Sequence, residues 1–148
     1  MLDLGAGHGA LTSHLIAAGA QVLAVELHPV RAQILRDRFA NDPLRVVEAD
    51  LGSLHLPRRP FRVVANPAYH LTTAMLHRLL ARDSALIAAD LVLQRSAVRA
   101  FVGGRGPQRW WRRWSLTEGR PLPRSAFTRP PTVDSRVLLI RRQLGTNG

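Results

Sequence analysis

The sequence predicts an α/β domain built on a parallel sheet with helices on both faces. Short apolar runs alternate with helix-like segments from the first residue onward, and a glycine-rich turn at residues 5–9 separates the first run from the first helix-like segment. Such alternation is typical of parallel sheets, because each return to the same edge needs a crossover that is usually helical. The chain has 148 residues, which fits one domain with one core.

The first half of the chain shows the alternation most clearly. We expect strands at residues 1–4, 22–26 and 44–48, and helices at residues 10–18 and 29–39. Leu11, Leu15 and Ala18 recur at helical spacing and should face the core. Gly19 suits the end of the first helix and Pro29 the first turn of the second.

The second half continues the pattern and then changes character. A strand at residues 61–65 precedes a helix whose Met75, Leu76, Leu79 and Leu80 should point inward. The apolar run at residues 85–93 predicts a strand buried on both faces. A short helix should follow to residue 102, then loops that include a basic aromatic cluster at residues 110–114, in which at least one tryptophan packs into the core.

The chain should end with two strands, one within residues 114–127 and one at residues 136–142. We expect a single domain over residues 1–144 and a disordered tail at residues 145–148.

Charge is distributed unevenly along the chain. All 21 basic residues are arginine, and residues 95–148 hold twelve of them against two acidic residues, whereas residues 1–94 hold nine against eight. Arginine offers a planar fork that matches phosphate, so the C-terminal third should meet a polyanion. Arginine-rich coding in a GC-rich genome and a solvated charged face are the alternative explanation, although they do not account for the asymmetry.

The sequence gives no support for an exported protein, a membrane protein or a metal-binding protein. The chain has no cysteine, no apolar run near the length of a membrane span and no export signal, so we expect a cytoplasmic monomer away from membranes. His70 and His77 could share a helix face but have no third ligand at metal-binding spacing, so we expect no metal.

The glycine-rich turn predicts a nucleotide-like cofactor. Glycines after a strand allow a sharp turn and a close approach to a ligand, but Gly5, Gly7 and Ala10 also fit the dinucleotide pattern G-x-G-x-x-A, so the turn alone does not identify the cofactor. Asp3 and a further glycine at Gly9 favour S-adenosylmethionine, whose methionine end is positively charged.

Two more carboxylates follow the next two strands. Glu26 is placed to accept hydrogen bonds from ribose hydroxyls, and Asp50 to accept one from the adenine amine. Each alone could be a solvated residue at a strand end. Together with Asp3 they occupy three successive strand ends, at the edge where such sheets bind ligands, which favours a binding role.

A second loop, Asn66-Pro67-Ala68-Tyr69, follows the strand at residues 61–65. It puts an amide, two carbonyl groups and an aromatic ring at a strand end, which suits a planar amine. This loop resembles the (N/D)-(I/P)-P-(Y/F) signature of amino-methyltransferases. With the turn at residues 3–9, the Leu71-Thr72-Thr73 continuation and the late segment at residues 127–135, the chain resembles the rRNA adenine dimethylase family, above all its erythromycin-resistance (Erm) branch.

The resemblance implies a Rossmann-like sheet for S-adenosylmethionine-dependent methylation of the exocyclic amine of an adenine in 23S rRNA, which gives macrolide-type antibiotic resistance. Relative to the family, Ala68 and Arg129 replace prolines, the start lies inside the first strand, and the C-terminal helical domain is absent. The expected partner is large-subunit rRNA, met before full ribosome assembly.

The site residues that we predict fall into three groups. The catalytic group is Asn66, Pro67, Tyr69 and Phe127; the cofactor group is Asp3, Gly5, Ala6, Gly7, Gly9, Glu26, Leu27, Asp50, Leu51 and Asn66; the RNA group is Arg105, Arg109, Arg112, Arg113, Arg120 and Arg124. Methylation of DNA adenine or protein glutamine, and a non-catalytic RNA-binding module, remain alternatives.

Overall fold

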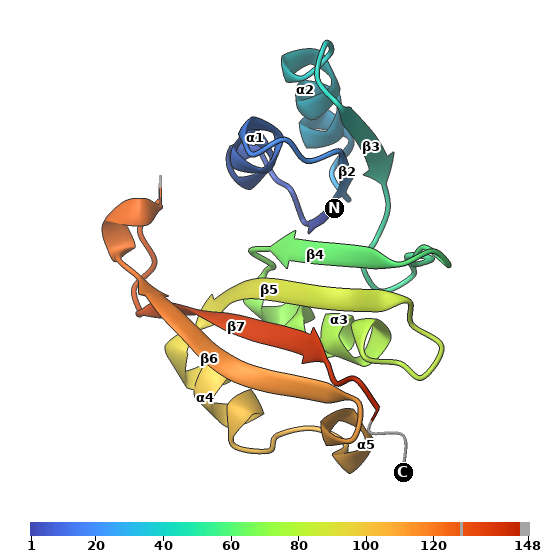
Figure 1. Ribbon diagram of the computed structural model, residues 1–148. Coiled ribbons are helices and arrows are strands. Elements are labelled where there is room, and N and C mark those ends of the chain that lie inside the picture. The colour runs from blue at the N-terminus through green and yellow to red at the C-terminus, as the bar shows by residue number, and fades with distance from the viewer. Residues whose placement is uncertain (128, 146–148) are drawn as a thin grey trace.

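A computed structural model describes residues 1–127 and 129–145 and contains one seven-stranded sheet with the strand order β3-β2-β1-β4-β5-β7-β6 (Figure 1). The strands are β1 (Leu2–Leu4), β2 (Val22–Glu26), β3 (Leu44–Glu48), β4 (Phe61–Ala65), β5 (Leu86–Gln94), β6 (Trp114–Leu122) and β7 (Ser135–Arg142). Strand β7 is antiparallel to both of its neighbours, and every other pair is parallel. The predicted parallel sheet is therefore confirmed, with one reversed strand near its end.

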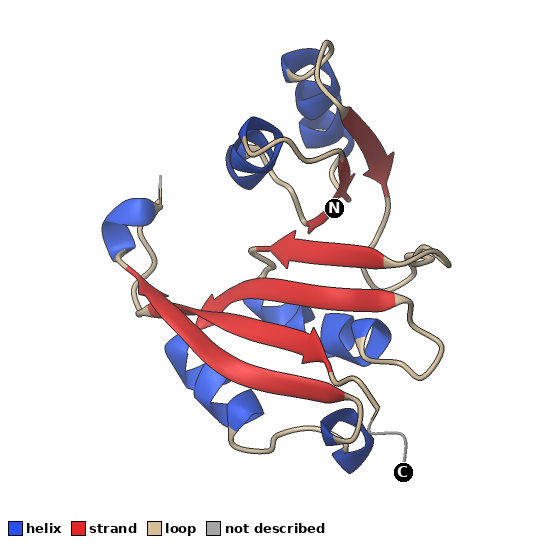
Figure 2. Ribbon diagram, viewed as in Figure 1, coloured by secondary structure: helices blue, strands red, loops and turns tan. Residues whose placement is uncertain are grey.

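Helices lie on both faces of the sheet, as predicted (Figure 2). They are α1 (Ala10–Ala17), α2 (Pro29–Arg38), α3 (Thr72–Leu79), α4 (Arg95–Val102) and α5 (Gln108–Trp111), with short 3₁₀ turns η1 (Tyr69–Leu71) and η2 (Arg124–Ala126). Successive side chains of a strand point to opposite faces. On β1, Leu2 and Leu4 join the main core cluster with Leu76 of α3, whereas Asp3 bonds to Thr12 of α1, so these two helices cover opposite faces.

The first helix turns a different side to the sheet from the one that its apolar spacing predicts. Thr12 is completely buried, Leu11 and Leu15 are half-buried, and Ala18 is exposed. The Thr12 hydroxyl donates to the buried Asp3 carboxylate at 2.6 Å. A buried carboxylate must be hydrogen-bonded, and this requirement sets the rotation of the helix. The predicted inward side of α3 is correct, since Met75, Leu76, Leu79 and Leu80 are all buried.

The prediction that the strand at residues 85–93 is buried on both faces is wrong. One face of β5 packs under α3 and α4 through residues such as Leu91 and Leu93. On the other face Asp90 and Val92 are half-exposed, and Ile87 is 39% exposed. Within the described part of the chain, α1 and α2 stand over β1, β2 and β3, and the front of β4, β5, β7 and β6 carries no helix (Figure 1).

The basic aromatic segment at residues 110–114 is more regular than the predicted loop, because it contains the end of α5 and the start of β6. Trp110 and Trp114 are each 1% exposed and belong to the main core cluster, which confirms that tryptophan packs here. Gly106 has a φ of 132°, and a Cβ there would lie 2.6 Å from the Trp110 ring. The loop before α5 thus needs a glycine to close over that tryptophan.

None of the helices in the described residues is long and apolar enough to span a membrane. The predicted tail at residues 145–148 lies outside the described residues except for Gly145, which belongs to no helix or strand.

Candidate active site

The glycine-rich turn leaves β1 and folds back over β2. The amides of Gly5 and Ala6 both donate to the Val25 carbonyl, at 2.9 and 3.0 Å. Gly5, Gly7 and Gly9 have φ values of 74°, 59° and 89°, where a side chain is strained.

The three glycines of the turn differ in what surrounds them. A Cβ on Gly9 would lie 2.7 Å from Phe39 and 2.8 Å from Leu35 of the adjoining helix, whereas a Cβ on Gly5 or Gly7 would meet nothing within 4 Å. Gly9 therefore anchors the turn against α2, and Gly5 and Gly7 face open space.

Glu26, the last residue of β2, holds this turn in place through hydrogen bonds. Its carboxylate accepts hydrogen bonds from the Gly7 amide at 2.8 Å, the His28 amide at 3.1 Å and the Arg31 Nε at 3.1 Å. These backbone and guanidinium donors outweigh the effect of burial and lower the pKa of Glu26 below its usual value. Because two carboxylate oxygens can accept about four hydrogen bonds, Glu26 keeps capacity for a ligand hydroxyl.

Asp3 lies under the turn and is 1% exposed. Burial raises its pKa from 3.8 to about 6, the Thr12 hydroxyl opposes that rise, and the charge of nearby Glu26 adds to it. A buried, charged carboxylate lowers the stability of the fold. Groups whose pKa is perturbed in this way are found preferentially at functional sites.

The other predicted cofactor residues surround the same edge of the sheet. Asp50 is exposed and follows β3, where its Oδ1 accepts from the Gly52 amide at 2.8 Å. Leu27 is 63% exposed at the end of β2, whereas Leu51 is 9% exposed and packs in the main core cluster. Leu27 is therefore free to contact a ligand, and Leu51 supports the edge mainly by packing.

The four residues of the predicted catalytic group line one pocket of about 240 Å³ at the ends of β4 and β5. Asn66, Pro67 and Tyr69 come from the β4 loop, and Phe127 comes from the segment between β6 and β7, 58 positions after Tyr69 in the sequence. Tyr69 is 63% exposed although it lines the pocket. Among the described residues no hydrogen bond uses the Asn66 amide or the Tyr69 hydroxyl, so both are available to a ligand.

Further polar groups in this pocket were not predicted. Thr72, Gln94, Arg129 and Ser135 also line it. Thr72 is 3% exposed and its hydroxyl has no partner among the described residues. Gln94 and Ser135 face each other in the register of β5 and β7. Gln94 could have been found from the sequence, because it follows directly after the apolar run at residues 85–93. Ser135 could be placed only once the reversed direction of β7 was known.

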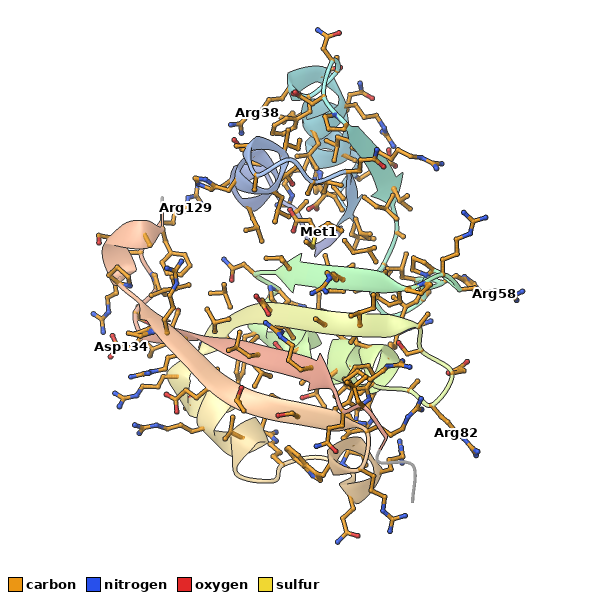
Figure 3. The ribbon with its side chains drawn as sticks, viewed as in Figure 1. Met1, Arg38, Arg58, Arg82, Arg129 and Asp134 are labelled. Atoms are coloured by element: carbon orange, nitrogen blue, oxygen red, sulfur yellow. The ribbon has the colours of Figure 1, made fainter. Side chains whose placement is uncertain are left out.

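The six predicted RNA-binding arginines form two groups at opposite ends of the sheet. Arg105, Arg109, Arg112 and Arg113 lie between α4 and the start of β6, and Arg120 and Arg124 lie at its end. Residues 114–119 of β6 lie between Arg113 and Arg120 and separate the groups by roughly 20–25 Å along the strand. Figure 3 labels further charged residues at both ends of the strands, with Arg129 and Asp134 at one end and Arg58 and Arg82 at the other.

Local contacts of these arginines also differ. Arg105 lies over the Phe101 ring at 5.7 Å, Arg113 donates to the Arg82 carbonyl, and Arg124 approaches Asp134 at 3.6 Å. Only Arg120 and Arg124 share the end of the sheet that holds the pocket.

The residues around the turn are compatible with S-adenosylmethionine. Gly5 and Gly7 leave open space, Glu26 has a free acceptor position for a ribose hydroxyl, and Asp50 and Leu27 are exposed for polar and apolar contacts. Across the described residues, no group of three or more histidine, aspartate or glutamate side chains is arranged to hold a metal ion.

The chain is similar in sequence to known proteins along nearly its whole length. The family model of ribosomal RNA adenine dimethylases matches residues 1–145. An rRNA adenine N-6-methyltransferase of Corynebacterium diphtheriae is 33% identical over 146 residues, covering 96% of this chain and 57% of the relative. The mycinamicin-resistance protein MyrB of Micromonospora griseorubida is 36% identical over 148 residues, covering 97% and 47%.

A solved structure gives the same answer for the fold. The 23S rRNA methyltransferase ErmE superposes with a TM-score of 0.85 at 29% identity, covering 96% of this chain and 60% of that one. The chain thus spans about half the length of the curated relatives that it matches. It belongs to the ribosomal RNA adenine dimethylase family, in the erythromycin-resistance (Erm) branch.

Proposed function

We propose that this chain carries the catalytic part of an S-adenosylmethionine-dependent enzyme that methylates the exocyclic amine of an adenine in 23S rRNA and thereby gives macrolide-type resistance. The observation that carries the proposal is the pocket that joins Asn66, Pro67 and Tyr69 with the distant Phe127. An amide, a carbonyl and two aromatic rings around one cavity suit a flat base that bears an amine.

The cofactor side of the proposal rests on the turn and the two strands next to it. S-adenosylmethionine supplies an activated methyl group when it is bound. Gly5 and Gly7 leave room for it, Glu26 keeps an acceptor position for a ribose hydroxyl, and Asp3 puts negative charge beneath the turn, where the positive methionine end would lie. Strands β1 and β4 are paired, so the Gly5 turn and the Asn66 loop leave neighbouring strand ends.

The substrate side follows from the chemistry of an aromatic amine. Its lone pair is shared with the ring, so it is a poor nucleophile. In this proposal the Asn66 side-chain oxygen and the Pro67 carbonyl accept its two N–H groups, which favours a pyramidal nitrogen and exposes the lone pair. The methylated, positively charged nitrogen loses its proton readily, so no strong base is needed. Alignment of reacting atoms is worth up to about 7–11 kcal/mol and supplies most of the rate.

The rings of Tyr69 and Phe127 would stack on a base that has left its stack in the RNA. Taking a base out of a stack costs a few kcal/mol, and stacking on an aromatic side chain returns about 1–3 kcal/mol. These two contributions nearly cancel, so net affinity must come from arginine contacts to phosphates. The excess of arginine in the last third of the chain is consistent with that requirement.

The test is methyl transfer from S-adenosylmethionine with a labelled methyl group to separate 23S rRNA, 16S rRNA, DNA and protein substrates. We expect label in 23S rRNA, recovered as N6-methylated adenosine after digestion. Label in 16S rRNA, DNA or protein instead would reject the substrate, and RNA binding with no transfer to any substrate would identify a binding module. Glu26→Ala should weaken binding of the cofactor in a calorimetric titration, and unchanged affinity would reject the assignment of the turn.

A further inference from the structure

A second pocket adjoins the first and shares Ser135 with it. It has a volume of about 300 Å³ and is lined by Arg95 and Arg136, by Asp134, and by the apolar segment of residues 121–123. Gln94 lines the first pocket and Arg95, the next residue, lines the second. The two pockets are therefore neighbours at the same edge of the sheet, a few ångströms of backbone apart.

The charges in the second pocket leave one cation without an acidic partner. Arg136 is paired with Glu118 at 2.9 Å, and Asp134 is paired with Arg124 at 3.6 Å. Among the described residues, Arg95 takes part in no ion pair, and its side chain makes no hydrogen bond. Its Nε is buried and has no acceptor. Arg95 as a whole is half-buried, and a charged group that has a buried donor without an acceptor is unfavourable, so this position suits an anionic ligand.

The backbone around Arg95 holds the pocket in shape. The Arg95 amide donates to the Asp134 carbonyl at 2.8 Å, which ties the start of α4 to the segment that precedes β7. The positive end of the α4 dipole lies at the same place and adds to the field of the guanidinium. Pro121 and Pro123 give rigid apolar walls.

We propose that this second pocket binds the backbone phosphate next to the target adenine, with Arg95 as the phosphate ligand. The inference rests on the proposed function, because it treats the first pocket as the base site. It assigns to Arg95 a role that none of the six arginines predicted from the sequence supplies. When the base enters between Tyr69 and Phe127, the adjoining sugar-phosphate runs past Ser135 into the second pocket.

The experiment combines a protein variant with a neutral RNA linkage. Affinity is measured by fluorescence anisotropy for a short single-stranded RNA with one adenine, and for two versions in which the linkage on the 5′ or the 3′ side of that adenine is an uncharged methylphosphonate. For the unaltered chain, one of the two neutral linkages should lower affinity by about fivefold to tenfold. Arg95→Gln should lower affinity for the natural RNA by a similar factor, and the same neutral linkage should then have no further effect.

Two control variants make the result specific. Arg109→Gln changes an exposed arginine at the far end of the sheet and should keep the full effect of the neutral linkage. Arg95→Lys keeps the charge and should keep part of that effect. Thermal unfolding of all three variants shows whether each one is folded.

The inference is overturned if Arg95→Gln, folded, keeps the full effect of the neutral linkage, or if neither linkage matters to the unaltered chain while that chain still methylates 23S rRNA. The absence of methyl transfer to any RNA would instead reject the proposed function.

Discussion

Replacement of Asp3 by asparagine should stabilise the fold at neutral pH, because the charge of the buried carboxylate works against folding. Its pKa is raised from 3.8 to about 6 by burial. Each unit is worth about 1.4 kcal/mol, so the charged form costs about 3 kcal/mol of folding stability at pH 7. This is an upper value, because the asparagine amide must also find an acceptor beside Thr12.

The sign follows from proton binding. Between pH 3.8 and about 6 the folded state holds the Asp3 proton more tightly than the unfolded state, so this group lowers stability as the pH rises through that window. Asparagine does not titrate. The stability of Asp3→Asn minus that of the unaltered chain should therefore grow from pH 4 to pH 6 and reach a plateau by pH 7. Glu26, whose pKa is lowered, titrates in both proteins and largely cancels in the difference.

The assay is urea unfolding at half-unit steps from pH 4 to pH 7.5. Asp42→Asn, at an exposed position after α2, is the matched control for the change of a carboxylate to an amide. A difference between Asp3→Asn and the unaltered chain that is independent of pH, or that shrinks as the pH rises, would refute the reasoning. If Asp3 also serves the cofactor, the stabilised variant should bind S-adenosylmethionine more weakly, whereas a purely structural carboxylate would leave that affinity unchanged.

Three further predictions follow from exposure, space and charge. Tyr69→Ala should lower methyl transfer by about 100-fold through misplacement of the base while cofactor affinity in calorimetry stays close to normal; equal loss of both would make Tyr69 structural. Gly9→Ala should cost about 1–3 kcal/mol more in urea unfolding than Gly7→Ala, because only Gly9 faces packed side chains; equal costs would contradict the packing. Arg112→Ala with Arg113→Ala should reduce the slope of log affinity against log salt for RNA by about 1.4, and an unchanged slope would exclude phosphate contacts there.

The alternating elements of the first half could be predicted because their signals are local. Pro29 begins α2 as expected, and the strand at residues 22–26 matches β2 to the residue. The buried side of α1 could not be predicted, because a long-range hydrogen bond from Thr12 to Asp3 decides it rather than the spacing of Leu11 and Leu15. Apolar periodicity describes the average environment of a helix and contains no information about a single buried charge.

Strand β5 shows a second limit of sequence reasoning. A continuous apolar run is consistent with a strand buried on both faces, yet Ile87 is 39% exposed and Asp90 forms an ion pair with Arg141 at 2.6 Å on the open face. Whether a helix covers that face depends on where the crossovers run, and the crossovers of this chain place α3 and α4 on the same side. The Asp90 within the run was the one local sign of exposure.

The predicted residues of the first pocket come in one stretch, apart from Phe127, which the family resemblance supplied. Asn66 to Tyr69 form a contiguous motif, whereas Ser135 and Arg95 enter the two pockets only because β7 runs antiparallel between β5 and β6. The course of β6 explains the two groups of arginines. Since β6 runs from the end that holds Trp114 to the end that holds Leu122, a basic segment in the sequence is divided between both ends of the sheet. A charge count by segment predicts a polyanion partner, but only the strand directions show which arginines can reach a nucleotide in the pocket.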